Sequence, residues 1–313
     1  MHTVLNVIGP VFGIVLLGFG LTRTGVLSAA TSEGLTRFMF YVAVPAMLFR
    51  TLAATALPDS VPWAYIAAFY GASFVAFGLG MTLARWRWRW SRRDQGIGGL
   101  AAGYSNMVML GFPLVITAFG ESAALPLFIL LALQSLLMFP LTTWVIEIYG
   151  NTGNTPRTGI LATFGKLALN PVIASLLLGI GANLSGLEIT GPLSSMLELI
   201  GAAAPACALV ALGAGLAQYE IRGAIRESLG FVVLKSIIHP ILVWAACLAL
   251  DVAALWTQVA VVLAAMPTGI NAFIFARNYD ARIEVVSKTI VFSTLVSIVT
   301  VAALLHRFLN QGV

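Results

Sequence analysis

The sequence predicts an all-α polytopic membrane protein with ten transmembrane helices arranged as a 5+5 inverted repeat. Of its 313 residues, 59% are hydrophobic and only 9% are charged, whereas soluble globular proteins carry about 25% charged residues. Its apolar runs continue for about 20 residues, which is typical of membrane helices and not of the short alternating strands of a barrel. Two of the runs are also interrupted in the same way at corresponding positions of the two halves.

Ten apolar runs with short connections define the predicted spans. We expect the spans at residues 3–22, 33–54, 62–85, 97–118, 124–147, 160–183, 192–217, 230–250, 256–277 and 285–306. The first run lacks the short core and cleavage pattern of a signal peptide, so we expect it to be retained. The longest clearly polar connection runs from Gly150 to Arg157, in the middle of the chain.

The basic residues predict the direction of the spans. Fifteen of the 17 Lys and Arg residues fall on one side of the predicted membrane, and only Arg50 and Arg307 fall on the other. The five arginines between Arg85 and Arg93 are the densest group. Because loops rich in Lys and Arg stay on the cytoplasmic side, both termini are predicted to lie on the outer side.

Five spans in each half mean that the two halves insert with opposite topology. The first repeat would comprise residues 1–150 and the second residues 151–313. Prolines occupy matching spans: Pro45 and Pro205 in the second span of each half, and Pro113 and Pro267 in the fourth. Inverted repeats of this kind place the substrate near the bilayer midplane, at the interface of the repeats.

The fourth and ninth spans contain the matched interruptions. The segments from Tyr104 to Pro113 and from Met266 to Asn271 each contain proline, glycine and asparagine. Proline lacks an amide hydrogen and clashes with the carbonyl four residues earlier, so the carbonyls of Met109 and Leu263 are predicted to be free. Broken helix persists in a membrane only inside protein or beside a water-filled cavity. Paired breaks therefore predict the binding site of a transporter.

The chemistry of the breaks suits a carboxylate. Half-helices beginning near Pro113 and Pro267 would direct amide groups into the cavity, which favours an anion without an isolated buried charge. Asn106 and Asn271 would complete the polar lining; the alternative role for these asparagines is hydrogen bonding between helices. The full predicted substrate-binding set is Asn106, Asn271, Ser105, Met107, Pro113, Pro267, Thr268, Gly269, Val44 and Met47.

The coupling mechanism is constrained by missing acidic residues. Spans 4, 5, 9 and 10 have no acidic residue in their central parts, which argues against proton antiport. Backbone carbonyls, Gln134, Ser135 and the two asparagines could still hold a sodium ion, so sodium coupling and passive movement of the anion both stay open. The two cysteines, Cys207 and Cys247, form no metal or disulfide pattern, and no cofactor is predicted.

Three basic side chains in or near the membrane have a possible coupling or supporting role. Lys235 would support the substrate or the breaks, or else extend to the inner interface. His239 would relay protons, or else pack as a neutral hydrogen-bonded residue. Arg50 would attract anions at the outer mouth, or else anchor its helix at the interface.

Several motifs resemble the auxin efflux carrier family, whose bacterial members include malate and malonate carriers. They are Gly13 to Gly25 with the following Leu-Ser, Phe40 to Phe49, Tyr104 to Pro113 and Pro267 to Tyr279. The resemblance implies the fold of bile-acid symporters and sodium/proton antiporters, in which helices 4 and 9 cross at the midplane. It further implies a scaffold of helices 1, 2, 6 and 7 that forms a homodimer, and a moving transport domain of helices 3–5 and 8–10. The short central loop is typical of compact bacterial members, so we expect the bacterial inner membrane.

We therefore predict an elevator-type carrier of small organic anions and not an enzyme. No G-x-x-x-x-G-K-[ST] sequence occurs, so a nucleotide-driven pump is not indicated. An intramembrane serine protease would use Ser105 and His239, but the residues around Ser105 lack the second glycine expected of such proteases. The alternatives within transport are a sodium-coupled symporter of the bile-acid type and an anion channel. The expected partners are a small carboxylate, the lipid bilayer and a second copy of the chain; nucleic acid is not expected.

Overall fold

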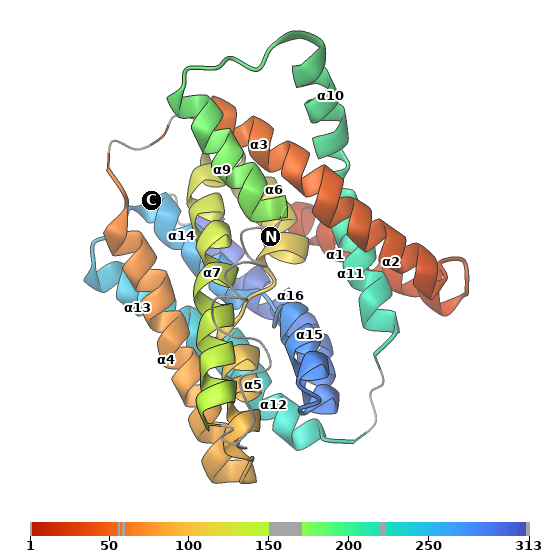
Figure 1. The fold of residues 1–313 in the computed structure, drawn as a ribbon, viewed down its shortest axis with the longest axis vertical. Coiled ribbons are helices and arrows are strands. Elements are labelled where there is room, and N and C mark those ends of the chain that lie inside the picture. The colour runs from red at the N-terminus through yellow and green to blue at the C-terminus, as the bar shows by residue number, and fades with distance from the viewer. Residues whose placement is uncertain (1, 56, 58–59, 150–170, 220–222, 311–313) are drawn as a thin grey trace.

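The computed structural model describes residues 2–55, 57, 60–149, 171–219 and 223–310, and these form a bundle of helices (Figure 1). In that view α2, α3, α10 and α11 lie on one side of the bundle, and α4, α5, α12 and α13 lie on the other. The Gly150–Arg157 connection, the boundary between the two predicted repeats and the first part of the predicted span 160–183 lie outside the described residues.

Helices account for nearly all regular structure in the described part of the chain. The first half contains α1 (His2–Arg23), α2 (Ala29–Phe38), the π-turn η1 (Met39–Ala43), α3 (Val44–Ala54), α4 (Trp63–Trp88), α5 (Arg92–Gly103), the π-turn η2 (Met107–Gly111), α6 (Phe112–Phe119), the 3₁₀ turn η3 (Glu121–Ala123) and α7 (Ala124–Tyr149). The second half contains α9 (Pro171–Leu184), α10 (Gly191–Ala202), α11 (Ala204–Ala217), α12 (Ile225–Val233), the π-turn η4 (Leu234–Ile238), α13 (His239–Ala249), α14 (Ala254–Ala265), α15 (Asn271–Asn278) and α16 (Ile283–Asn310). The prediction of an all-α fold is confirmed for these residues.

Seven of the predicted spans correspond to helical segments that are long and apolar enough to cross a membrane. These segments are Val4–Arg23, Ala29–Ala54, Trp63–Trp88, Glu121–Glu147, Gly191–Ala217, Ile225–Ala249 and Ile283–Leu309. The other three predicted spans contain shorter apolar helices: Met107–Phe119, Pro171–Leu184 and Ala254–Ala265. The count of ten spans and their arrangement as an inverted repeat stay predictions.

Glycines bring several helix pairs into close contact. A Cβ atom on Gly213 of α11 would lie 1.9 Å from the Val15 carbonyl oxygen of α1, and one on Gly18 of α1 would lie 2.3 Å from the Val210 carbonyl oxygen of α11. Small residues let membrane helices approach this closely, because side chains no longer separate their backbones. The α3–α9 and α4–α5 pairs are also packed extensively.

Prolines follow π-turns at three places in the bundle. Pro45, Pro113 and Pro240 lie in the first turn of α3, α6 and α13, and each of these helices directly follows η1, η2 or η4. A π-turn changes the backbone hydrogen-bond spacing, which accommodates a residue that cannot donate. These prolines therefore occur in continuing helices and do not interrupt them.

Candidate functional site

The two interrupted segments lie against each other and are joined through their backbones. Ser105 and Thr268 form an isolated antiparallel bridge. Two hydrogen bonds flank the bridge: the Asn106 amide donates to the Pro267 carbonyl at 2.9 Å, and the Gly269 amide donates to the Tyr104 carbonyl at 3.0 Å. Each break thus supplies partners for the other's backbone, which is the condition for irregular backbone inside a membrane protein.

Each break separates two half-helices. In the first, α5 ends at Gly103 and the next helical segment begins at Met107; in the second, α14 ends at Ala265 and α15 begins at Asn271. The breaks therefore bring together two helix C-termini, which carry partial negative charge, and two helix N-termini, which carry partial positive charge.

The prolines act differently from the sequence prediction. Pro113 lies six residues after Met107, within a helical segment that continues to Phe119, so the half-helix does not begin near this proline. The preceding π-turn accommodates its ring, which is why no break forms there. Pro267 does lie in a break, but the Leu263 carbonyl accepts a hydrogen bond from the Met266 amide at 3.3 Å. The prediction of a free carbonyl at Leu263 is wrong, because a local turn supplies its partner.

The two asparagine side chains have different partners. Asn106 is buried, and its Oδ1 accepts a hydrogen bond from the Met109 amide at 3.3 Å. The Asn106 Nδ2 is also buried, yet it has no hydrogen-bond partner in the described part of the chain. Asn271 is half-buried, and its Nδ2 donates to the Tyr104 hydroxyl at 2.8 Å. A buried unsatisfied donor costs about 1–3 kcal/mol, so Asn106 offers a hydrogen bond that a ligand oxygen can complete.

The side chains of the bridge residues Ser105 and Thr268, and of Gln134 beside them, differ in how many of their polar atoms have partners. Gln134 of α7 donates its Nε2 to the Ser105 carbonyl at 2.8 Å, whereas the Gln134 Oε1 and the Ser105 Oγ are buried without a partner among the described residues. The Thr268 hydroxyl donates to the Ala101 carbonyl at 2.7 Å, and the Thr268 amide donates to the Ser293 Oγ at 3.1 Å. Thr268 therefore holds the second break in place, and Ser105 and Gln134 keep oxygen atoms available.

The predicted apolar residues fall into two groups. Met107 is buried at the start of η2, and Gly269 lies beneath the Tyr104 ring, where an added Cβ would be 2.5 Å from the ring Cδ1. Val44 is buried in the first turn of α3, and Met47 is half-buried against α10. The structure thus places Met107 and Gly269 in the breaks themselves, and it places Val44 and Met47 on a neighbouring helix.

A buried polar chain lies beside the second break. Lys235 and His239 are both fully buried. The Lys235 Nζ donates to the Ala264 carbonyl at 2.5 Å and lies 3.1 Å from the His239 Nδ1. The His239 Nε2 lies 2.9 Å from the Ser73 hydroxyl, which donates to the Phe69 carbonyl. That serine hydrogen is already used, so Nε2 carries the imidazole hydrogen and Nδ1 accepts from the lysine.

This geometry decides between the two roles predicted for Lys235. Its Nζ is buried against a carbonyl in the last turn of α14, so it does not extend to the membrane interface. A donor that hydrogen-bonds one of the last carbonyls of a helix supplies the partner that the helix itself lacks there. Lys235 therefore supports the half-helix that leads into the second break.

Arg50 has a local carboxylate partner. Its guanidinium group lies 3.0 Å from the Glu198 carboxylate of α10, and both side chains are exposed. An exposed ion pair of this kind contributes at most about 1 kcal/mol to stability. The pair links α3 to α10 and partly balances the charge that would attract anions.

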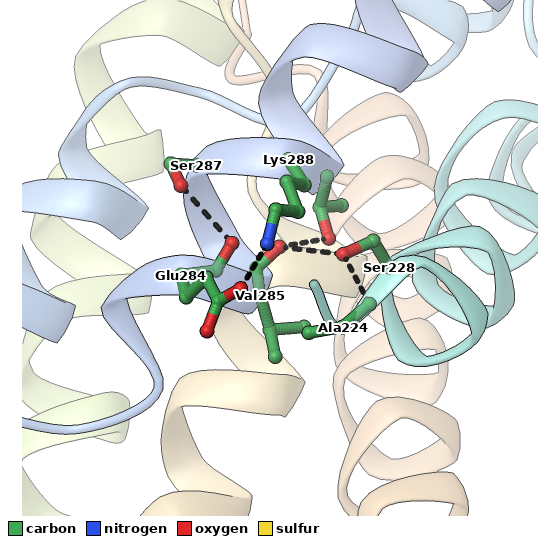
Figure 2. Close-up of polar contacts among 7 residues, drawn as sticks. Ala224, Ser228, Glu284, Val285, Ser287 and Lys288 are labelled. Atoms are coloured by element: carbon green, nitrogen blue, oxygen red, sulfur yellow. Dashed lines mark hydrogen bonds and ion pairs between the residues drawn. The ribbon is translucent and has the colours of Figure 1, made fainter. Parts of the chain in front are cut away.

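A second fully buried lysine lies near the start of α16 (Figure 2). Lys288 forms an ion pair with Glu284, one turn earlier on the same helix. The Ser228 hydroxyl of α12 lies 3.1 Å from both the Ala224 and the Val285 carbonyl oxygens, so it ties α12 to α16. Sequence reasoning used Lys288 only to assign topology, although its i,i+4 spacing from Glu284 is a signal for the ion pair.

Three residues near the breaks have partners that the sequence analysis did not foresee: Tyr104, Ser73 and Ser293. Tyr104 is adjacent to the Ser-Asn pair of the first break, so its position was a usable signal. Ser73 and Ser293 lie in ordinary apolar runs, where serine is common, and only the packing of distant helices reveals their roles.

Comparison with known proteins adds an independent line of support. The family described as Membrane transport protein matches residues 3–305. A Rhizobium meliloti protein named "Putative malonate transporter" is 28% identical over 311 residues, which cover 98% of this chain and 96% of that protein. The Arabidopsis thaliana protein named "Auxin efflux carrier component 8" is 22% identical over 355 residues, which cover 97% of this chain and 96% of that protein. A Methanothermobacter thermautotrophicus protein named "Uncharacterized transporter" is 27% identical over 302 residues, with 96% and 95% coverage.

These findings agree with the apolar helices and the paired breaks. The family and the named relatives are transporters and not enzymes, and the seven apolar segments indicate an integral membrane protein. The chain belongs to the Membrane transport protein family, the auxin efflux carrier family that its motifs resemble.

Proposed function

We propose that this transporter is a secondary carrier of small organic anions, with its site at the paired breaks near the bilayer midplane. The observation that carries the proposal is the buried Asn106 Nδ2, a donor without a partner in the described chain. Asn106 directly precedes the helical segment that begins at Met107, in the break that is bridged to the one before Asn271. Amide donors and helix N-termini suit a carboxylate, because they hydrogen-bond an anion without burying a second full charge.

The polar side chains beside the second break favour an anion over a cation. Lys235 is a buried donor there, and it forms no ion pair with a carboxylate in the described part of the chain. Its Nζ donates to the Ala264 carbonyl and to the His239 Nδ1, which a neutral amine can do as well as an ammonium group. A bound carboxylate would compensate a further proton on this amine, since a buried charge without a partner is costly.

The packing supports a ten-span inverted repeat with crossing spans 4 and 9. α1 in span 1 packs on α11 in span 7, and α9 in span 6 packs on α3 in span 2. Exchanging the two halves converts the first pair into the second, as an inverted repeat requires. The bridge between Ser105 and Thr268 supports the crossing, since it joins the middle of span 4 to the middle of span 9.

The hydrogen bonds of the breaks support an elevator mechanism with two groups of helices. Gln134, Lys235 and Ser293 hold the breaks from spans 5, 8 and 10, all of which belong to the proposed transport domain. Spans 1, 2, 6 and 7 would form the scaffold and the homodimer contact; exposed apolar side chains on α9 and α10 provide a surface for it. The carrier would lie in a bacterial inner membrane with both termini outside.

Sodium-coupled symport is the second candidate. The Ser105 Oγ and the Gln134 Oε1 are buried oxygen atoms without partners among the described residues, and hard cations bind oxygen ligands. These two atoms therefore make sodium dependence worth testing together with anion transport.

The test is transport by the purified protein in liposomes. Because one relative is named a malonate transporter, labelled malonate is the first substrate, followed by malate and indole-3-acetate, under imposed sodium, proton and voltage gradients. We expect saturable uptake and counterflow, which separate a carrier from a channel. Lack of flux across this panel would argue against the proposed carrier.

Two substitutions locate the site. Asn106→Ala and Asn271→Ala should each lower uptake about tenfold, the effect of losing one charge-assisted hydrogen bond. Asn278→Ala is the matched control, because Asn278 is exposed at the other end of α15. If both break variants stay folded and transport as well as this control, the proposed site is wrong.

A further inference from the structure

Tyr104 connects the two breaks through both its backbone and its side chain. Its carbonyl accepts from the Gly269 amide at 3.0 Å, and its hydroxyl accepts from the Asn271 Nδ2 at 2.8 Å. The same hydroxyl lies 3.1 Å from the Ser135 Oγ of α7. We propose that Tyr104 is a positioning residue that orients the Asn271 amide toward the carboxylate of the substrate.

The hydroxyl has the hydrogen-bonding capacity that this role requires. A phenol donates one hydrogen and accepts through its oxygen. Because Tyr104 accepts from Asn271, its own hydrogen is available to Ser135, and the three groups form a directed chain. The bond fixes one hydrogen of the Asn271 amide and therefore the plane of the whole amide group. The second amide hydrogen is left with a defined direction, as a donor for a carboxylate oxygen.

The Tyr104 ring is held firmly enough to place its hydroxyl. The residue is 4% exposed, and its ring stacks on the Phe139 ring with centroids 5.3 Å apart. Gly269 lies directly beneath the ring, where a Cβ atom would come within 2.6 Å of both Cδ1 and Cε1. A ring packed from these sides has little freedom to tilt, so its hydroxyl is a fixed reference point for Asn271.

The alternative is that Tyr104 only fills space and satisfies Asn271 in the folded protein. Tyr65 provides a matched control for that role. It is also a buried tyrosine in a span, it packs against Trp256, and its hydroxyl donates to the Pro126 carbonyl at 3.1 Å. Removing the Tyr65 hydroxyl takes one buried hydrogen bond from the protein and removing the Tyr104 hydroxyl takes two. Only the Tyr104 hydroxyl contacts a residue of the proposed substrate site.

The experiment compares Tyr104→Phe with Tyr65→Phe in liposomes, using malonate as the probe and measuring KM and maximal rate separately. This inference rests on the proposed function, so Asn271→Ala and the double variant Tyr104→Phe/Asn271→Ala are measured in parallel. We expect Tyr104→Phe to raise KM about five- to tenfold, to change the maximal rate less than about twofold, and to leave the melting temperature close to that of Tyr65→Phe. The double variant should transport no worse than Asn271→Ala alone, because the tyrosine acts through that asparagine.

The outcomes separate the two proposals. Normal transport by Asn271→Ala would overturn the positioning role, and normal transport by both Asn106→Ala and Asn271→Ala would overturn the proposed site as well. Impaired Asn271→Ala with a Tyr104→Phe KM equal to that of Tyr65→Phe would overturn the positioning role alone, as would additive losses in the double variant. If Tyr104→Phe does not fold, Ser135→Ala replaces it. This variant keeps the tyrosine and removes the last partner in the hydrogen-bond chain from Asn271 through Tyr104 to Ser135, and it should raise KM about two- to threefold. An unchanged KM in that variant would overturn the role.

Discussion

Gly269→Ala is the sharpest structural test of how the two breaks fit together. The new Cβ atom would lie 2.5 Å from Tyr104 Cδ1 and 2.6 Å from Cε1, whereas carbon atoms normally approach to about 3.5–4.0 Å. The ring or the second break must therefore shift by about 1 Å. Overpacking of this size costs about 1–3 kcal/mol. A displaced ring also weakens the bond from Asn271 to the Tyr104 hydroxyl, which adds about 1 kcal/mol.

Gly111→Ala is the matched control within the other interrupted segment. Its Cβ atom would meet the Leu263 Cδ2 at 2.8 Å, but this atom is the tip of a flexible side chain and can move away. Alanine is also favoured over glycine inside a helical segment by about 0.5–1 kcal/mol. We therefore expect Gly111→Ala to melt near the wild-type temperature and Gly269→Ala to melt clearly below it, with malonate uptake reduced about fivefold or more. Equal melting temperatures and equal uptake for the two variants would refute the close packing of Tyr104 on Gly269.

Two further predictions concern the scaffold packing and the buried lysine. Gly213→Ala should destabilise the protein by about 3 kcal/mol or more, because its Cβ would lie 1.9 Å from the Val15 carbonyl oxygen. Gly215→Ala, with nothing within 4 Å of the new atom, should be nearly neutral, and thermal melting in detergent distinguishes the two. Lys235→Met should keep the protein folded but raise the KM for malonate about fivefold or more, because it removes the donor to the Ala264 carbonyl and the amine that a bound carboxylate would hold protonated. Liposome uptake measures this KM, and an unchanged value would contradict a role for Lys235 in anion binding.

The helices can be predicted from the sequence because the residues that make a membrane span are consecutive in the chain. About 20 consecutive apolar residues are needed to cross a bilayer, and the run from 62 to 85 was recognisable without knowledge of its neighbours; the structure places α4 at Trp63–Trp88. The breaks were recognisable for the same reason, since proline, glycine and asparagine occur together there. The role of Pro113 was not recognisable from the sequence. Whether a π-helical turn forms before a proline depends on how the flanking helix packs and not on the proline alone.

The partners of the site residues could not be read from the sequence because they come from segments far apart in the chain. Both asparagines were predicted to line the site, but only the contact between the breaks assigns Asn271 to the Tyr104 hydroxyl and leaves the Asn106 Nδ2 without a partner. For Thr268 the sequence predicts contact with the substrate, and this stays a prediction. Its hydroxyl already donates to the Ala101 carbonyl, so only its oxygen is available, as an acceptor. Residue type thus identifies candidates for the site. The register between the two distant break segments determines which of their polar atoms are left to hydrogen-bond a ligand.

The two buried lysines have different partners, and the difference bears on the proposed anion site. Both are fully buried, but Lys288 is paired with the Glu284 carboxylate, as Figure 2 shows. Lys235 instead contacts the Ala264 carbonyl and the His239 Nδ1, which supply partial charges and not a full negative charge. An ammonium group without a charged partner is costly to bury, so the Lys235 amine would hold a third proton best while a carboxylate is bound nearby. In the proposed carrier, binding of the anion and protonation of Lys235 would therefore favour each other, whereas a sodium ion alone would gain nothing from this lysine.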